Sequence, residues 1–192
     1  MIKNDKIVII FINILNKTRN MLKIYNEYQK HGIDNYYKTH SKDYYNPHEE
    51  KIKYIYIKHI LNIITKYDKI VDIACGDGMI TRIINKYNNN KNVDGIDPYF
   101  NNEYTQMKLS FEDIAKGELN KYDKIYNIAI CSYAFHLMDK KLIYDFMSQL
   151  SMITKRFIII TPSKKINIKH PLWNIIKEIR EDKVTIIILD VM

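Results

Sequence analysis

Residues 71–78, Val-Asp-Ile-Ala-Cys-Gly-Asp-Gly, constrain the fold of this chain more than any other segment. An apolar run at residues 69–74 enters a turn containing Gly76 and Gly78, and residues 79–87 follow with helical spacing. Glycine permits a tight turn and lets the backbone approach a ligand closely. The segment therefore predicts a buried strand, a ligand-facing turn and a helix in succession.

Similar strand and helix patterns alternate along the rest of the chain. We expect further strands at residues 92–96, 107–110, 124–132, 156–161 and 184–189, and helices at residues 140–152 and 171–180. Strands that alternate with helices favour parallel pairing through right-handed crossovers. The sequence therefore predicts an α/β fold with a doubly wound, mostly parallel sheet. Because few residues follow the last strand, we expect the terminal hairpin of this sheet to be incomplete.

Residues 1–66 have a different character, and we expect a helical extension packed on a core of residues 67–192. Pro47 and the two glutamates just after it are typical of the first turn of a helix, which we expect to run to about residue 66. The longest apolar run near the amino end, residues 7–15, is far shorter than the roughly 20 residues of a membrane span. We therefore expect no membrane anchor.

The composition is that of one globular domain. Of the 192 residues 46% are hydrophobic, enough for a sizeable core without a disulfide or a metal. Cys75 and Cys131 form no CxxC pair, so we expect small buried side chains, a cytoplasmic location and no metal site. A net charge of +8 is compatible with a nucleic-acid partner, but only four of the 30 basic residues are arginine, the better reader of phosphates and bases.

A second acid strengthens the prediction of a ligand site. Asp97 lies 25 residues after Asp72, at the end of the second expected strand and directly before Pro98. An acid in this place can accept both ribose hydroxyls of an adenosine. Two plainer interpretations stay open: Asp72 orients the turn, and Asp97 is a turn residue before proline.

Asp-Ile-Ala-Cys-Gly-Asp-Gly, followed by the acid at position 97, resembles the first motifs of class I S-adenosylmethionine-dependent methyltransferases, which have a Rossmann-like fold. The resemblance covers about residues 66–165. It implies that the acid of the first strand anchors the methionine end of the cofactor, that the acid of the second strand binds the ribose, and that the turn passes beneath the cofactor. The implied cofactor-binding residues are Asp72, Ala74, Cys75, Gly76, Asp97 and Pro98. Alanine stands at position 74, where glycine is usual.

Later motifs of the same family match in order. Asp113 and Ile114 follow the third expected strand, where the family places an acid on the adenine amino group. Glu112 could serve instead, and either acid could simply begin a helix. Residues 123–137 resemble the fourth motif, a strand that ends at the reacting centre, and this puts Ser132 beside the cofactor.

Methyl transfer from a sulfonium depends mainly on the alignment of nucleophile, methyl and sulfur. A base is needed only if the acceptor must lose a proton, and His136 and Tyr133, just past the fourth strand, are the candidates. The alternative for His136 is a structural histidine.

A narrower resemblance involves Tyr44-Tyr45-Asn46-Pro47-His48. With residues 132–137 and 161–165, this segment is similar to a group of small eukaryotic methyltransferase-like proteins. The resemblance implies a lid, with Tyr44 over the cofactor and Asn46 and His48 on the substrate side. The alternative is an asparagine turn before a helix.

Two other functions stay open. A nicotinamide-dependent oxidoreductase would need glycine where Thr81 stands. A catalytically inactive methyltransferase-like partner subunit would keep the fold without turnover.

For an active enzyme, the acceptor could be RNA, protein or a small molecule. Lys164, Lys165 and Lys169 follow the fifth strand and favour an acidic acceptor, whereas the fourth motif lacks the Asp/Asn-Pro-Pro-aromatic signature of enzymes that methylate amino groups on bases or glutamine.

Overall fold

The computed structural model of the protein describes residues 26–27, 30, 32–41, 44, 46–162 and 166–192. The chain divides into two units, Met1–Glu49 and Glu50–Met192. This division falls before the expected boundary between residues 66 and 67, because Ile52, Ile55 and Tyr56 belong to a buried cluster of the second unit. No helix of the described residues is long and apolar enough to cross a membrane.

The second unit alternates strands and helices. Its helices are α3 (Glu49–His59), α4 (Met79–Asn88), α5 (Phe111–Ala115) and α6 (Ile143–Ser151), and short 3-10 helices occur at η2 (Leu61–Ile63), η3 (Glu118–Tyr122), η4 (Phe135–Leu137) and η5 (Lys140–Leu142). Its strands are β1 (Ile70–Ile73), β2 (Val93–Ile96), β3 (Tyr126–Ser132), β4 (Thr154–Thr161), β5 (Trp173–Glu181) and β6 (Val184–Val191).

The six strands form one mostly parallel sheet in the order β2-β1-β3-β4-β6-β5. Strand β1 pairs in parallel with β2 and β3, and β3 pairs in parallel with β4. Strand β6 runs antiparallel to both β4 and β5. The predicted doubly wound, Rossmann-like α/β sheet is therefore confirmed.

The carboxyl end differs from the prediction. The helix predicted at residues 171–180 is wrong, because Trp173–Glu181 is strand β5, paired along its length with β6. A two-residue turn at Asp182 and Lys183, with φ of 46° and 64°, closes a complete terminal hairpin, which the sequence did not lead us to expect. Of the strand predicted at residues 107–110, the structure forms a single parallel bridge between Met107 and Ile96.

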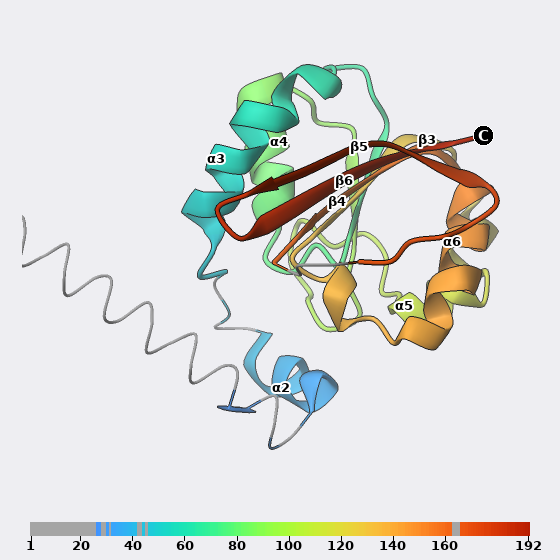
Figure 1. The fold of residues 1–192 in the computed structure, drawn as a ribbon. Coiled ribbons are helices and arrows are strands. Elements are labelled where there is room, and N and C mark those ends of the chain that lie inside the picture. Colours follow the sequence, from blue (N-terminus) through green and yellow to red (C-terminus); the bar gives the residue numbers. More distant parts are fainter. Residues whose placement is uncertain (1–25, 28–29, 31, 42–43, 45, 163–165) are drawn as a thin grey trace, which may run out of the picture. The chain divides into compact units, whose positions relative to one another are not determined.

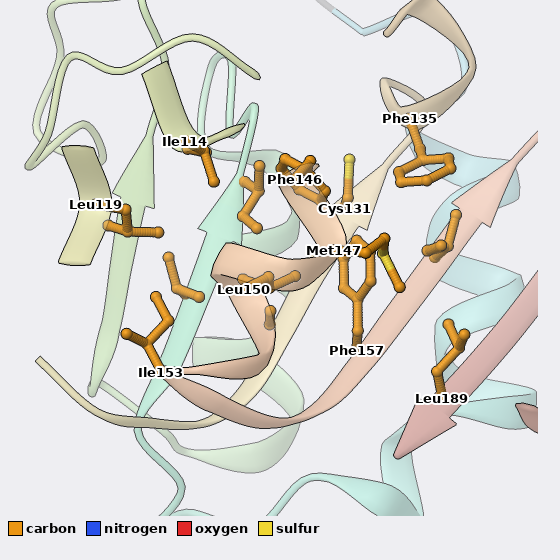
Figure 2. Close-up of a cluster of buried hydrophobic side chains, with 14 of the residues drawn as sticks. Ile114, Leu119, Cys131, Phe135, Phe146, Met147, Leu150, Ile153, Phe157 and Leu189 are labelled. Carbon is orange, nitrogen blue, oxygen red and sulfur yellow. The ribbon is translucent and has the colours of Figure 1, made fainter. Parts of the chain in front are cut away.

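Alternate residues of each strand face opposite sides of the sheet, and each side is covered by helices. Even-numbered side chains such as Ile128, Ile130 and Ile158 pack with α3 and α4 in one buried cluster. Odd-numbered side chains of β3 and β4, such as Ala129 and Phe157, pack against α5 and α6 in the other cluster, where Phe146, Phe157 and Leu150 are fully buried (Figure 2). The result is a three-layer α/β/α arrangement, with α3 and α4 on one face and α5 and α6 on the other (Figure 1).

Between β4 and β5, Ile168 packs in the buried cluster on the α6 side of the sheet and Ile166 packs against it, and the described residues of this connection, 162 and 166–172, form no helix. His170 anchors this connection. Its Nδ1 accepts a hydrogen bond from the Leu172 amide at 3.2 Å, so its Nε2 is free to donate to the Ser148 hydroxyl on α6 at 2.9 Å. The Trp173 indole then donates to the Met147 carbonyl oxygen at 2.8 Å, which fixes the start of β5.

The described part of the first unit contains helix α2 (Ile33–His40). The ring of Tyr36 stacks on that of His40, with centroids 4.7 Å apart. Tyr37 meets Tyr44 edge to face at 5.4 Å. These aromatic contacts hold the residues around α2 together.

Candidate functional site

The candidate site lies where the order of the strands reverses. The chain passes from β1 through α4 to β2 on one side, and then through α5 to β3 on the other side of β1. In doubly wound sheets, ligands bind at the carboxyl ends of the strands beside such a reversal. Two non-glycine residues with positive φ follow these ends, Ala74 (56°) after β1 and Tyr133 (57°) after β3. Such conformations cost about 1–2 kcal/mol each and concentrate at functional sites.

Asp72 is a buried acid within β1. It lies on the α4 side of the sheet, and its Oδ2 accepts a hydrogen bond from the Thr81 hydroxyl at 3.0 Å. Burial raises the pKa of Asp72 to about 7, the Thr81 hydrogen bond opposes the rise, and the nearby Asp97 and Asp77 charges add to it. A buried carboxyl with this pKa has a strong electrostatic preference for an added cation or hydrogen-bond donor.

The glycine turn after β1 has an unusual backbone. Ala74, Gly76 and Gly78 all have positive φ, of 56°, 56° and 79°. Gly78 is the N-cap residue directly before α4, and a Cβ added there would lie 2.1 Å from Cγ of Tyr104. The turn therefore needs glycine at position 78 both for its backbone conformation and for the space that the tyrosine ring occupies.

Asp97 connects the ends of β1 and β2. Its Oδ2 accepts the Gly76 amide at 3.0 Å, and its Oδ1 accepts the amides of Tyr99 and Phe100 at 2.9 and 3.2 Å. Burial raises the pKa of Asp97, and these three donors oppose the rise. The bonds to Tyr99 and Phe100 are the turn chemistry of the plainer interpretation. Oδ2 retains one acceptor position, so binding of a ribose stays a prediction that this geometry allows.

Asp113 begins helix α5 in a capping box with Ser110. Its Oδ2 accepts the Ser110 amide at 2.8 Å and the Ser110 hydroxyl at 2.7 Å, and the Ser110 oxygen accepts the Asp113 amide at 3.1 Å. These bonds lower the pKa of Asp113. The helix-start role is therefore real, while a contact with adenine stays a prediction. Ile114 is buried in the cluster on the α5 side of the sheet.

The end of β3 carries three candidate residues. The Ser132 hydroxyl oxygen is buried and has no hydrogen-bond partner among the described residues. Burial, helped by the charge of Asp182, raises the pKa of Tyr133 to about 12, so its phenol stays protonated at neutral pH. His136 lies in η4 and is solvent-exposed, yet the surrounding protein lowers its pKa by desolvation. Its ring is therefore neutral at pH 7 and can accept a proton.

The two cysteines are free and buried, and burial raises the pKa of both thiols. Neither is therefore poised as a nucleophile. The Cys75 thiol lies 3.8 Å from the Tyr104 carbonyl oxygen and 3.6 Å from the Thr105 hydroxyl, which makes it a packing element of the turn.

The predicted lid residues Tyr44, Asn46 and His48 belong to the first unit. The Oδ1 of Asn46 accepts the His48 amide at 2.9 Å, as in the asparagine turn that was the alternative to a lid. The ring of Tyr44 packs on Tyr37. Lys164 and Lys165 lie outside the described residues.

Sequence reasoning missed three polar partners of the turn. Thr81 bonds Asp72, Asn102 donates to the Gly76 carbonyl oxygen at 3.0 Å, and Arg82 donates to the Asp77 carbonyl oxygen at 2.6 Å. The amino-acid sequence did contain a signal for Thr81: a threonine in the first turn of the helix that follows the strand of Asp72 can reach back to that acid. Nothing in the sequence marked Asn102, which lies in a polar loop.

The fold is similar to that of solved S-adenosylmethionine-dependent methyltransferases of class I. No protein-family model matches the chain, and no curated protein matches it. Solved structures do. Magnesium protoporphyrin IX methyltransferase from Synechocystis PCC 6803 with bound S-adenosylmethionine aligns at 12% identity with a TM-score of 0.54, covering 87% of this chain and 94% of that one.

Two further structures have the same fold. The 16S rRNA methyltransferase RmtF in complex with S-adenosylhomocysteine aligns at 8% identity with a TM-score of 0.56, covering 92% of this chain and 75% of that one. An O-methyltransferase family protein from Burkholderia thailandensis aligns at 8% identity with a TM-score of 0.53, covering 76% and 59%.

Proposed function

We propose that the protein binds S-adenosylmethionine and transfers its methyl group. The observation that carries this proposal is the Asp97 carboxylate bonded to the Gly76 amide, which joins an acid at the end of β2 to the glycine turn after β1. In the methyltransferase fold these are the two elements that would meet the ribose and the methionine part of the cofactor. The similar structures crystallised with S-adenosylmethionine or S-adenosylhomocysteine support the proposal.

The residues present fit this cofactor. Asp72, with its raised pKa, would be stabilised by the ammonium group of the methionine part. The unpartnered Ser132 hydroxyl offers a second polar contact at the neighbouring strand end. Asp97 would hold the ribose through the remaining acceptor position on Oδ2. Asp113 or Glu112, with Pro98 and Ile114, would line the adenine side.

When bound, the cofactor supplies a methyl group on a positively charged sulfur, which is already a good leaving group. The protein then has to align the acceptor atom and exclude water. Neutral His136 can take a proton from an acceptor that must lose one, and Tyr133 can donate a hydrogen bond through its protonated phenol. These two residues are the proposed substrate-side groups of the carboxyl edge.

The proposed acceptor class is open among RNA, protein and small molecules. The net charge of +8 and the lysines after β4 favour an acidic acceptor. The lid is also part of the proposal, and its residues Tyr44, Asn46 and His48 all belong to the first unit. One ground for the inactive-subunit alternative was the expected incomplete terminal hairpin, whereas β5 and β6 form a complete one. The other ground, that a fold does not imply turnover, is addressed by the labelling experiment below.

Calorimetric titration of S-adenosylmethionine and S-adenosylhomocysteine tests cofactor binding. We expect micromolar affinity for the intact protein and about tenfold weaker binding for Asp97→Asn. Asparagine replaces one carboxylate oxygen by an NH2 group, which would place a donor against the Gly76 amide or against a ribose hydroxyl. Asp94→Asn is the matched control, since Asp94 lies on the same strand and bonds Lys124 and Tyr126 instead. Absence of binding by the intact protein would overturn the proposal.

Turnover is tested with S-adenosylmethionine labelled in its methyl group. The intact protein and Asp97→Asn are incubated with an RNA fraction, a protein fraction and a small-molecule fraction. Label that enters one fraction with the intact protein, and much less with the variant, supports transfer and identifies the acceptor class. Cofactor binding without label in any fraction would support the inactive-subunit alternative.

A further inference from the structure

We propose that residues 98–105 form a brace that holds the glycine turn in its ligand-binding conformation, with Asn102 and Tyr104 as positioning residues. The brace is the loop between β2 and the bridge at Met107. Its effect on cofactor affinity rests on the function proposed above, whereas its effect on the order of the turn does not.

Asn102 ties the brace to the turn. Its Nδ2 donates to the Gly76 carbonyl oxygen at 3.0 Å. Its Oδ1 accepts the Tyr104 amide at 2.9 Å and the Thr105 hydroxyl at 3.2 Å, which keeps the loop itself folded. Because Asp97 accepts the Gly76 amide, both the amide and the carbonyl group of Gly76 are held from the β2 side. Gly76 is therefore fixed in its left-handed conformation by two separate side chains.

Tyr104 covers the other end of the turn. Its ring occupies the space where a side chain at Gly78 would lie. The guanidinium carbon of Arg82 lies 5.6 Å from the centre of this ring, while the same guanidinium bonds the Asp77 carbonyl oxygen at 2.6 Å. The ring and the arginine thus enclose residues 77 and 78 from the outside.

A glycine in β2 allows the brace to approach this closely. A Cβ added at Gly95 would lie 2.0 Å from the Tyr104 carbonyl oxygen and 2.8 Å from the Cys75 sulfur. Three of the five glycines, at positions 76, 78 and 95, therefore lie under or against the brace. This concentration indicates that the fit between brace and turn is specific.

Within the brace Phe100 is buried, whereas Asn102 and Tyr104 contribute little to the cores of the protein. Asn102 is exposed, and Tyr104 belongs to neither buried cluster. Substitutions at these positions open no core cavity, so they should loosen the turn without a large loss of global stability. This separates a positioning role from a merely structural one.

The test compares Asn102→Ala and Asn102→Asp with the intact protein, by calorimetric titration of both S-adenosylmethionine and S-adenosylhomocysteine and by thermal unfolding. Asp keeps the acceptor for the Tyr104 amide but cannot donate to Gly76. We expect both variants to bind both ligands about three- to tenfold more weakly, as for the loss of one hydrogen bond, with Tm nearly unchanged. Using both ligands controls for charge, because only S-adenosylmethionine carries the sulfonium.

Tyr104→Phe and Tyr104→Ala form the second pair. Phe keeps the ring over Gly78 and should bind both ligands like the intact protein. Ala removes the ring and should weaken binding of both ligands by a factor similar to that of the Asn102 variants. Equal binding by Ala and Phe would contradict the role of the ring.

Three results would contradict the proposed brace. They are unchanged ligand affinity in Asn102→Ala, a fall in Tm large enough to explain weaker binding by unfolding, and unchanged affinity of Asn102→Asp for S-adenosylhomocysteine, the ligand without the sulfonium. If the intact protein binds neither ligand, the proposed function is wrong. The brace is then tested by amide hydrogen exchange at residues 76–78, which reports the order of the turn without a ligand. Exchange threefold or more faster in Asn102→Ala supports it, and equal exchange overturns it.

Discussion

The Thr81 hydroxyl donates a hydrogen bond of 3.0 Å to the carboxylate of Asp72, and so joins helix α4 to strand β1 inside the protein. Both side chains are buried. Asp72 thus has a partner without a charge, and its pKa stays raised. The pair gives the candidate site an acid whose ionisation depends on what binds beside it.

Thr81→Val should destabilise the protein more at pH 8 than at pH 5. Valine has nearly the shape of threonine but removes the hydroxyl donor of the buried carboxylate, at a cost of about 1–3 kcal/mol when the acid is ionised. Urea unfolding at the two pH values measures the difference. Thr81→Ser keeps the hydroxyl, so its loss of unfolding free energy should be smaller and depend little on pH. Equal losses of unfolding free energy for Thr81→Val at both pH values would contradict the hydrogen bond to ionised Asp72.

Asp72→Asn should stabilise the ligand-free protein above pH 7. The pKa of Asp72 is about 7 in the folded protein and 3.8 for an ordinary aspartate, so the folded state binds more protons between these values and stability falls as pH rises through this window. A tenfold change in acidity corresponds to about 1.4 kcal/mol, which sets an upper limit of about 4 kcal/mol for the gain. The free energy of unfolding should change less between pH 4 and pH 8 in the variant than in the intact protein, and the cofactor affinity of the variant should fall.

Protonation of His170 should weaken the connection before β5. Desolvation lowers the pKa of His170, and its Nδ1 must stay unprotonated to accept the Leu172 amide. A lowered pKa means that the neutral form stabilises the fold at neutral pH and that this contribution is lost as pH falls below about 6.5. The stability difference between the intact protein and His170→Asn should therefore shrink from pH 7.5 to pH 5. A constant difference would contradict this role.

Lys183→Gly should raise Tm. Lys183 has φ of 64° in the turn between β5 and β6, where glycine carries no steric cost. A gain of about 1 kcal/mol corresponds to a rise of about 2–4 °C for a chain of this size. Differential scanning calorimetry measures it. Lys177→Gly, within β5, is the control and should lower Tm, because glycine weakens the interior of a strand.

Much of the sheet was predictable from local pattern. The runs that predict strands at residues 124–132 and 156–161 correspond to β3 (Tyr126–Ser132) and β4 (Thr154–Thr161), with ends shifted by two residues or fewer. Buried parallel strands are continuous apolar runs, and such runs are visible without any knowledge of their neighbours. The glycine turn was predictable for the same reason, since its constraint is local.

Strand β5 shows where local pattern fails. Ile175 and Ile179 are four residues apart, which fits one face of a helix, and they also fit an edge strand with one irregularity after Ile175. Pairing with β6 and the two-residue turn decide between these states. An edge strand contacts only one neighbour, so its own sequence carries a weak signal.

Elements whose cause lies within a few residues, such as most buried strands and the turn at Gly76 and Gly78, can be predicted from the amino-acid sequence, whereas the asparagine turn before α3 was one of two interpretations left open. The distant residues that complete the site are set by the tertiary fold. Asn102 reaches the carbonyl oxygen of Gly76 across 26 residues of chain, and Asp97 reaches its amide across 21. Such contacts depend on strand order and on the absence of a side chain at Gly95, and no local pattern encodes them because their free energy comes from partners that only the folded sheet brings together.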